Sequence, residues 1–513
     1  MSGSINVPGY PANNRVPGVF AVVDASKANT GTVAQRALLI GPMLSTGTAT
    51  AGTPVVSAGM GDAIASYGAG SILAHMVERY RNLDLTGELW CLPLADAGGA
   101  TAATGTIAIT GPATAAGTIP LYINGVYIGC PVSSGDSATT IATNMAAAIN
   151  AKASPFGNPI SVTAAAATGT VTVTARNKGT LGNQGTIVLS PLGVAGGQGQ
   201  PGTSNVAGVA VAITGFTGGA TDPTVATALA NLPPIPFDFI CCPFNDATSL
   251  NALQSYLGDA AGRWNWSVQL FGHVFTAKGG TLAARTTWST ARNDQHASAI
   301  GAWNSPSPDW AWAVDFCAAT AVSIRSNPAT PIGGLQGGAQ LNVMAPPAAA
   351  IDIFSERQTL LFDGMSTHVV NPAGQVFVDR AITTYQTNGA GAPDNSYLNL
   401  NVPFQLMAFI RAVETLIGSN FNQSILVQDN ARIPAGSGMV TAKTIAASVV
   451  GLYQAICDSG VPGAPVGLVQ DPTSFAQNIQ AQNVGGGVVK LLLPVKLGNQ
   501  LIAVAMNVQF TQP

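Results

Sequence analysis

Charge is the scarcest feature of this 513-residue sequence. Asp, Glu, Lys and Arg make up 8% of the residues, against roughly 25% in an ordinary soluble domain. The net charge is −3, from 20 basic and 23 acidic residues, so no basic excess exists to attract nucleic acid. A surface of small uncharged residues would explain this composition. Burial of much of the surface in an assembly would explain it equally well.

Long apolar runs and processing signals are also missing. No stretch of about 18 apolar residues occurs, so we expect no membrane insertion. Residues 1–14 lack both the basic start and the apolar run of a secretory signal. Cysteine is rare and no Cys-x-x-Cys pair occurs, so we expect reduced, mostly buried thiols made in a cytoplasm. The six cysteines are Cys91, Cys130, Cys241, Cys242, Cys317 and Cys457.

The sequence offers little material for catalysis or metal binding. Its four histidines are His75, His273, His296 and His368. None lies at ligand spacing from another histidine or cysteine, so no metal site is predicted. We expect His75 on the solvated face of a helix. His368 follows Asp363 and Ser366 closely, which predicts a polar turn, because the members of a catalytic triad are brought together by the fold. No catalytic residue is assigned.

Two glycine-rich segments match nucleotide-binding loops only in part. Residues 197–202 have the glycine spacing of a dinucleotide loop, but Pro201 lies inside it and no strand precedes it. Residues 436–444 end in Lys443-Thr444, but Ala442 replaces the glycine that a phosphate-binding loop needs before its lysine. We therefore expect no bound cofactor.

Short apolar strands alternate with amphipathic helices in two parts of the chain, 35–95 and 220–386. Strand, helix and strand in this order predict an α/β core domain with a largely parallel sheet. Because the pattern stops and resumes, we expect one discontinuous domain. The expected strands are 35–41, 88–94, 236–242 and 267–275, and the expected helices are 71–81 and 249–261, the latter stopped by Gly262.

The intervening residues 96–219 are rich in Ala, Gly and Thr and predict an inserted β-rich domain. Asn124-Gly125 between two apolar runs is a strong hairpin signal. Residues 135–151 predict a helix that begins at Asp136 or Ser137. Its apolar stripe consists of Ile141, Met145 and Ile149. The segments PISVTA and GTVTVTARN alternate with period two, as half-buried strands do.

Residues 387–513 predict an α+β C-terminal domain. A helix is expected over 402–418, with Pro403 near its start and Gly418 past its end. A second helix is expected over 441–458, where apolar residues recur at helical spacing. Its stripe consists of Ile445, Val449, Leu452 and Ile456.

Both ends of the chain read as strands without a partner in their own domain. Residues 1–34 form an expected extended arm, in which RVPGVFAVVD follows a polar leader, and 488–510 read as two strands around Gly498-Asn499. Unpaired apolar edges favour pairing with another chain. We therefore predict strand exchange between subunits, with flexible connectors at Asn13-Asn14 and 483–487. The expected inter-subunit residues are Val16, Val19, Phe20, Val22, Leu491, Leu493, Val495, Ile502, Val504 and Met506.

The order of these segments resembles the Mu-like contractile phage tail sheath proteins. The resemblance is carried by RVPGVFAVVDASKA before QRALLIG, by GSILAHMVERY before ELWCLPL, and by the insertion containing GDSATTIATNMAAAINA and VTVTARNKGTLGNQG. NPATPIGGLQG with FSERQTLLFDGMST and the two C-terminal helices extend it from about Val16 to Phe510. No single motif is diagnostic, and the order is the specific part.

The resemblance implies a subtilisin-like core domain that is catalytically inert in this chain. A protease of that fold needs Asp-Ser/Thr-Gly, His-Gly-Thr and Gly-Thr-Ser turns. In this sequence Val274 follows His273 and Leu282 follows Gly280-Thr281. The fold analogy thus supports architecture and not activity.

The resemblance also implies a structural role in a virion. Such subunits stack as hexameric rings around a tail tube protein, meet baseplate and tail terminator proteins, and contract to drive the tube through the host envelope during genome ejection. Assembly is expected in the host cytoplasm, with the inserted domain facing outward. Helix 402–418 would contact the tube through Arg411 and Glu414 or lie in the core, and we favour the core.

Two other classes of protein remain as alternatives. The Ala/Gly/Thr-rich insertion is compatible with a secreted adhesin or surface-layer protein, which would carry an export signal and usually more repeats. A hydrolase on the subtilisin-like core would need an assembled Ser-His-Asp site. A tail tube protein is a closer structural alternative, but tube subunits are usually far smaller.

Overall fold

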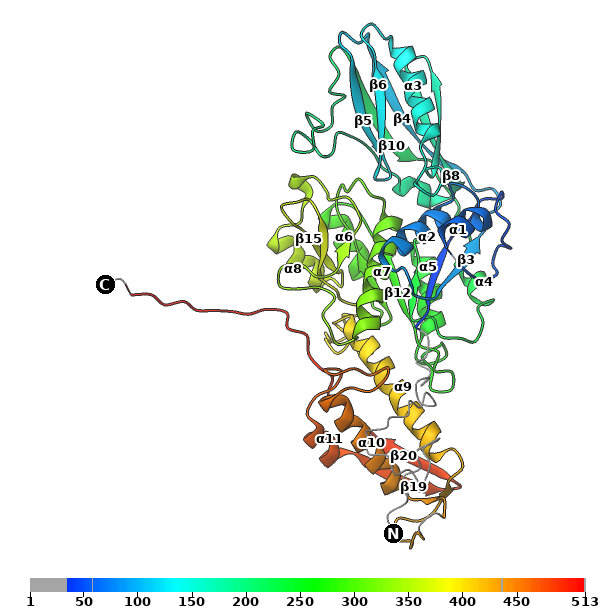
Figure 1. Cartoon of the computed structure of the whole chain (residues 1–513), viewed down its shortest axis with the longest axis vertical. Coiled ribbons are helices and arrows are strands. Elements are labelled where there is room, and N and C mark those ends of the chain that lie inside the picture. Colours follow the sequence, from blue (N-terminus) through cyan, green and yellow to red (C-terminus); the bar gives the residue numbers. More distant parts are fainter. Residues whose placement is uncertain (1–34, 58, 435–436, 512–513) are drawn as a thin grey trace, which may run out of the picture.

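The computed structural model describes residues 35–57, 59–434 and 437–511. In these ranges three bodies follow one another along the long axis (Figure 1). A β-rich domain lies at one end, an α/β domain in the middle and a smaller α+β body at the other end. The architecture is a mixed α/β, multidomain one, as the sequence predicts.

A six-stranded sheet forms the centre of the α/β domain, in the order β13-β12-β11-β1-β3-β2. All neighbours pair in parallel except the short edge strand β2. Strand β1 lies in the middle of the sheet, and the later strands are added on both sides of it, as in doubly wound folds. The strands are β1 (Ala37–Pro42), β2 (Val55–Val56), β3 (Leu89–Leu94), β11 (Phe239–Cys241), β12 (His273–Ala277) and β13 (Ala297–Ile300).

Helices cover both faces of this sheet (Figure 1). They are α1 (Met60–Tyr67), α2 (Ile72–Leu83), α4 (Val225–Leu229), α5 (Ala247–Leu257), α6 (Leu282–Thr290), α7 (Asp309–Ser326) and α8 (Phe354–Phe362). Beside them, a three-stranded sheet consists of β14 (Gln340–Leu341), β15 (Thr367–Val370) and β16 (Val376–Arg380). Helix α7 is the most deeply buried, with 13 of its 18 residues inside the core, and the sequence analysis did not predict it.

Two predicted boundaries in the α/β domain are wrong. Helix α5 ends at Leu257, where Gly258 caps it, and does not continue to Gly262. Strand β12 begins at His273 and not at residue 267, because 262–272 form a loop. The loop is held by the Trp264 indole N–H, which donates to the Gly272 carbonyl at 2.9 Å.

The β-rich domain has its own apolar core between two sheets and one helix. The predicted hairpin is confirmed, with Asn124 and Gly125 both at positive φ, 52° and 80°, as a type I′ turn requires. Ser137 caps the predicted helix, and all three residues of its stripe are buried. The elements are β4 (Ala102–Thr110), β5 (Gly117–Ile123), β6 (Val126–Val132), α3 (Ala138–Ala151), β7 (Val162–Ala167), β8 (Thr170–Lys178), β9 (Ile187–Leu189) and β10 (Ala210–Thr217).

Helix α9 (Asn401–Phe421) connects the α/β domain to the C-terminal body. Phe404 and Met407 belong to the core of the α/β domain, whereas Phe409 packs into the C-terminal core. Arg411 forms an ion pair with the fully buried Asp238 at 2.6 Å. Arg411 is therefore engaged inside the chain, in agreement with the core position that we favoured.

The end of α9 differs from the prediction, because the helix continues through Gly418 to Phe421. Gly418 is not among the glycines at positive φ, so it lies within the helix and does not form a left-handed cap that would end it. The rest of the C-terminal body contains β17 (Ile425–Leu426), β18 (Met439–Val440), α10 (Ala442–Asp458), α11 (Pro472–Asn478), β19 (Gln480–Gly485) and β20 (Val488–Leu492).

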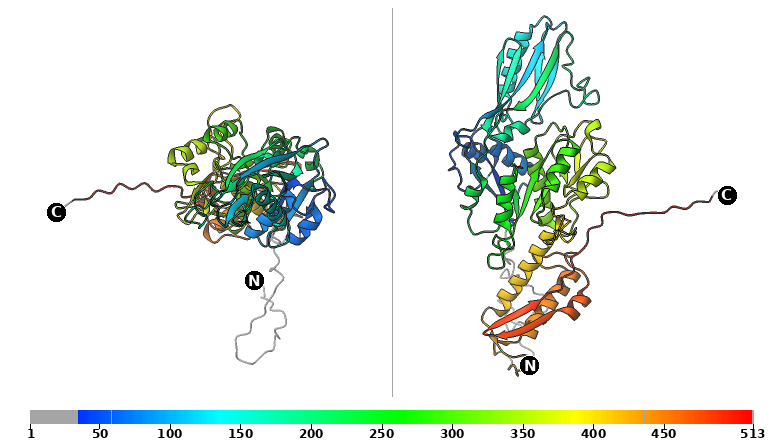
Figure 2. Two further views of the ribbon diagram at one scale, coloured as in Figure 1. Left: turned by 90° about the horizontal axis from the view of Figure 1, so that it is seen from above. Right: turned by 180° about the vertical axis from the view of Figure 1, so that it is seen from behind.

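The last hairpin of the chain is not where the sequence predicts it. Strands β19 and β20 pair antiparallel around Gly485, Gly486 and Gly487, whose φ values are 86°, 65° and 81°. Three consecutive left-handed positions are accessible to glycine without strain. Residues 483–485 therefore end strand β19 and Gly486-Gly487 form the hairpin turn, so residues 483–487 are not a connector. Figure 2 shows the hairpin from behind, at the end of the molecule opposite the β-rich domain.

Candidate assembly surface

The C-terminal extension, residues 499–511, projects away from the rest of the chain (Figures 1 and 2). No strand is assigned in it, and its side chains from 501 onward are exposed. Ile502, Val504 and Met506 are 43%, 58% and 81% exposed, and Val508 and Phe510 are each 80% exposed. These five apolar side chains alternate along the chain, so in an extended strand they lie on one face. Such an apolar, unpaired strand is a site for association with another chain.

The base of the extension is fixed to the body by hydrogen bonds. The Gly498 N–H donates to Leu468 O at 3.0 Å. The buried Gln405 side chain of α9 donates to Gly498 O at 2.9 Å, and the Gln500 amide group donates to Ala329 O at 3.4 Å. The extension is therefore anchored by hydrogen bonds up to Gln500, and beyond it no hydrogen bond joins it to the described residues.

The ten residues that the sequence assigns to inter-subunit strands fall into three groups. Ile502, Val504 and Met506 lie in the C-terminal extension. Leu491, Leu493 and Val495 are half-buried against the C-terminal core, and Leu491 pairs with Ala481. The expectation that 488–497 lacks a partner in its own domain is therefore wrong for β20, because the three glycines fold it back on β19. The last group, Val16, Val19, Phe20 and Val22, lies outside the described residues.

The hairpin of β19 and β20 is a second candidate surface. It forms a two-stranded sheet, and within the described residues both of its outer edges lack a partner strand. Val484, Val488 and Leu492 are 44%, 50% and 58% exposed on it. Two-stranded sheets are marginally stable in water, and added strands stabilise them. This hairpin is thus suited to accept a strand.

One serine and histidine pair tests the hydrolase alternative. The His273 Nε2 atom lies 2.9 Å from Ser298 Oγ, as in a nucleophile and base pair. Both side chains are fully buried, so a substrate cannot reach them. Within the described residues the His273 Nδ1 atom has no hydrogen-bond partner, whereas a catalytic histidine is oriented by one there. Burial also holds the pKa of His273 well below its usual range. This pair is therefore a poor hydrolase site.

His368 does not lie in the polar turn that the sequence predicts. It is on β15, almost fully buried, and burial lowers its pKa to about 4. The turn before it is Asp363-Gly364, and Ser366 already forms a β-bridge with Ile300. Among the described residues, no group of three His, Cys, Asp or Glu side chains could hold a metal ion. No helix in these ranges is long and apolar enough to cross a membrane.

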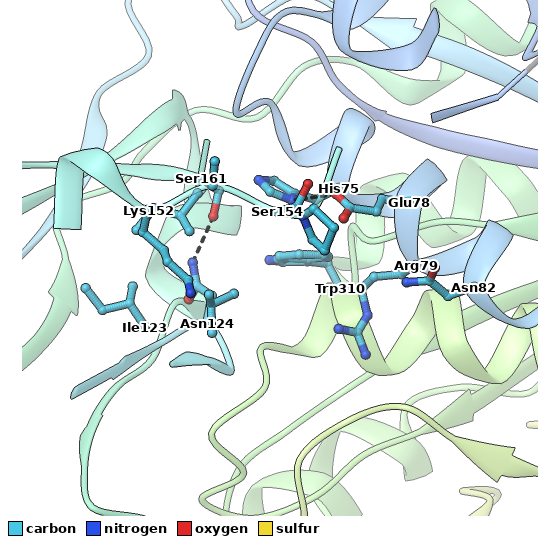
Figure 3. A pocket seen from close by; sticks show the side chains of 14 residues that line it. His75, Glu78, Arg79, Asn82, Ile123, Asn124, Lys152, Ser154, Ser161 and Trp310 are labelled. Atoms are coloured by element: carbon cyan, nitrogen blue, oxygen red, sulfur yellow. Dashed lines mark hydrogen bonds and ion pairs between the residues drawn. The ribbon is translucent and has the colours of Figure 1, made fainter. Parts of the chain in front are cut away.

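A cavity of about 290 Å³ lies where the β-rich domain meets the α/β domain. Figure 3 shows His75, Glu78 and Arg79 of α2 on one side, Trp310 of α7 at its centre and Lys152 of the β-rich domain opposite them. Lys152 follows the end of α3. The β-rich domain and the α/β domain thus both line the cavity, and they contact each other at its rim.

His75 takes part in the contact between these two bodies, so its predicted exposure is wrong. Its side chain is 14% exposed. His75 Nε2 lies 3.0 Å from Pro159 O, and its Nδ1 atom lies 3.2 Å from the Asn158 amide nitrogen. Asn158 in turn accepts a hydrogen bond from the Gly70 N–H at 2.7 Å. A single sequence does not reveal this contact, since it depends on a loop 84 residues away.

This histidine predicts an acid-sensitive contact. Burial lowers the pKa of His75 from 6.5 to about 4, so the unfolded chain binds the proton more tightly than the folded one. The contribution of the neutral His75 to the free energy of unfolding is complete above pH 6.5. It is lost as the pH falls towards 4, at about 1.4 kcal/mol per pH unit. In His75→Gln, whose amide group can still donate to Pro159, urea unfolding between pH 6.5 and 4 should show a correspondingly smaller slope. Equal slopes for both proteins would contradict this assignment.

One family model and several known proteins are similar to this chain. A family model described as the phage tail sheath protein central domain matches residues 218–384. The Mu-like prophage FluMu tail sheath protein of Haemophilus influenzae is 32% identical over 511 residues, which is 99% of each chain. The sheath tail protein of Desulfitobacterium hafniense is 12% identical, with 94% of this chain and 97% of that chain covered and a TM-score of 0.45.

The helical sheath of the anti-feeding prophage in its contracted state is 10% identical, with coverages of 98% and 100% and a TM-score of 0.40. Sequence identity with the Haemophilus protein over nearly the whole of both chains decides the family. This chain therefore belongs to the Mu-like phage tail sheath proteins, structural proteins of contractile phage tails.

Proposed function

We propose that the chain polymerises as stacked hexameric rings around a tail tube, and that contraction of this sheath drives the tube through the host envelope during genome ejection. The observation that carries the proposal is the C-terminal extension. It exposes five large apolar side chains on one strand face, and its backbone beyond Gln500 makes no hydrogen bond to the described residues. An extended segment of this kind gains most by completing the sheet of another copy.

The hairpin of β19 and β20 is the proposed acceptor for these strands. Its outer edges supply main-chain donors and acceptors, and its exposed Val488 and Leu492 supply apolar contacts. Addition of a C-terminal extension on one edge and of an N-terminal arm on the other would make four strands from three copies. Val16, Val19, Phe20 and Val22 would then face the sheet from the N-terminal arm.

Stored conformational energy is the proposed source of the work of contraction. In this scheme the extended sheath is metastable, and contraction enlarges contacts between neighbouring α/β domains. A gain on the order of a few kcal/mol per subunit, small beside the stability of a domain, would add up along many subunits. The strands stay paired while each subunit turns, because the exchange involves the arms alone.

The other proposed partners are the proteins that lie next to a sheath in a contractile tail. We propose that the C-terminal body faces the tail tube protein, that the β-rich domain faces outward, and that the terminal rings meet baseplate and tail terminator proteins. The two bodies lie at opposite ends of the long axis (Figure 1), which supports opposite radial positions. Assembly would take place in the host cytoplasm before the sheath becomes part of the virion.

Electron microscopy of the purified full-length chain tests this function. We expect hollow cylinders with sixfold end views to appear as the protein concentration rises, since the exposed arms need only other copies. The cylinders should enclose purified tail tubes when these are added before polymerisation. Compact single copies at every concentration, with tube added or not, would contradict the proposal.

A further inference from the structure

The cavity between the β-rich domain and the α/β domain has no part in the proposed function. Its volume is about 290 Å³, close to the lower limit of the volumes that small-molecule sites have. Its lining comes from α2 and the start of α7 in the α/β domain, and from the segment after α3 and the β5–β6 hairpin in the β-rich domain (Figure 3). A molecule bound in this cavity would therefore touch both domains.

Glu78, on α2, brings a carboxylate without a hydrogen bond to the cavity. Its side chain is 13% exposed, and none of the described residues donates a hydrogen bond to it. The His75 Nδ1 atom lies 3.8 Å from Glu78 Oε2, but burial lowers the pKa of His75 to about 4, which leaves this ring uncharged at neutral pH. A carboxylate that is mostly removed from water is stabilised by a cationic donor. Glu78 is therefore placed to accept from a positively charged group.

Trp310 and Lys152 bring donors without an acceptor to the same cavity. Trp310 is 5% exposed, and Figure 3 shows its ring nitrogen directed towards the side on which Lys152 lies. Among the described residues no group accepts from this N–H or from the Lys152 ammonium group, although buried indole N–H groups usually have a partner. The indole N–H groups of four other tryptophans each donate to an acceptor, in Trp90, Trp264, Trp288 and Trp312. This side of the cavity therefore offers two donors to an anion.

The lining of the cavity contains one unpaired charge of each sign. Arg79 is neutralised by the fully buried Asp315, which accepts from its Nε at 2.9 Å and from its Nη2 at 2.7 Å. Arg176, outside the lining, donates from Nε to a backbone carbonyl at 2.9 Å. The charges left over are Glu78 and Lys152, so the cavity is complementary to an occupant that carries both a cation and an anion. The rest of the lining includes the apolar side chains of Ile123, Val126, Pro155 and Ile160.

We propose that this cavity binds a small zwitterion of the class of the ω-amino acids, whose ammonium and carboxylate groups lie at the two ends of a short apolar chain. Its ammonium group pairs with Glu78, and its carboxylate accepts from the Trp310 indole N–H and from Lys152. Because Glu78 and Trp310 belong to the α/β domain and Lys152 to the β-rich domain, the bound zwitterion joins the two domains. The site lies within a single chain, so this inference does not rest on the proposed strand exchange.

Titration calorimetry of the dilute full-length chain tests this site with γ-aminobutyrate and ε-aminocaproate, two zwitterions of different chain length. We expect at least one of them to bind with a Kd on the order of 1 mM or tighter. The carboxylate and the amine of the same chain length serve as controls. Each control should bind at least about tenfold more weakly, because it leaves one charge of the cavity without a partner. No binding by either zwitterion, or equal binding by a control, would overturn the proposal.

Two substitutions of similar side-chain length assign the two ends of the ligand. Lys152→Met should lower the affinity for the zwitterion to that of the amine, since only the pair with Glu78 is left. Glu78→Gln should lower it to the affinity of the carboxylate, since only the contacts with Lys152 and Trp310 are left. Urea unfolding of each variant without ligand checks that it folds. A zwitterion that binds both folded variants as tightly as the unsubstituted chain must occupy another site, which would contradict the assignment.

Lysine acetylation of the unsubstituted chain gives a second test, which does not depend on the folding of a variant. Lys178, exposed at the end of β8 in the same domain, is the internal reference. At ten times its Kd, the zwitterion should lower the rate of acetylation of Lys152 relative to that of Lys178 about tenfold, which mass spectrometry can measure. The ratio of the two rates corrects for reagent that the amine of the ligand consumes. An unchanged ratio would show that Lys152 does not contact the ligand, and the proposal would fail.

Discussion

A chain that ends at Gln500 should fold normally and fail to form long ordered cylinders. Residues 501–511 are all exposed and make no hydrogen bond to the described part of the chain, so their removal should change the urea unfolding curve little. In an assembly each of the five large side chains on their apolar face would contribute about 1.5–3 kcal/mol when fully buried. Loss of all five should raise the concentration needed for polymerisation by at least about a thousandfold, which light scattering and electron microscopy would show.

The site of truncation matters for this experiment. Removal of residues from 488 onward would also delete β20 and the side chains of Leu491, Leu493 and Val495 from the C-terminal core, so failure to polymerise would follow from unfolding. A finer version changes Ile502, Val504 and Met506 to Asp. Its matched control changes Ala503 and Ala505, on the opposite strand face, to Ser. Ordered cylinders from the truncated chain would end the case for the C-terminal arm.

Local patterns in the sequence predict those helices and hairpins that are determined by residues close to them in the chain. The hairpin at Asn124-Gly125 and the helix capped by Ser137 are both confirmed, because their turn and cap residues act within a few positions. Helix α7 was missed for the opposite reason. It is buried on nearly all sides, so it has no polar face, and its apolar residues show no stripe to detect.

The candidate assembly surface was predicted in part. Ile502, Val504 and Met506, which the sequence singles out, are exposed in the structure, and their pairing with another subunit stays a prediction. The position of the last turn was wrong, because Gly498-Asn499 looks like a hairpin turn while Gly498 is in fact held by Gln405 and Leu468. Those partners lie far away in the sequence, on α9 and after α10, so only the fold brings them together.

The largest effect on stability is expected at the buried ion pair of Arg285 and Asp352, which joins α6 to the segment before α8. The two side chains are 0% and 5% exposed, and the carboxylate accepts from both Nη atoms of the guanidinium, at 2.7 Å from Nη1. Asp352→Ala leaves a buried cation without a counter-charge, which destabilises a protein by about 3–5 kcal/mol.

Tryptophan fluorescence can isolate this effect, because all seven tryptophans belong to the α/β domain and none to the other two bodies. The matched control is Arg36→Ala in the same domain, which breaks a pair with Glu88 whose side chains are 22% and 35% exposed. It should cost about 0–1 kcal/mol. A loss below 1 kcal/mol in Asp352→Ala would mean that water or a rearranged side chain solvates Arg285. The region around α8 would then be more easily rearranged than its packing implies.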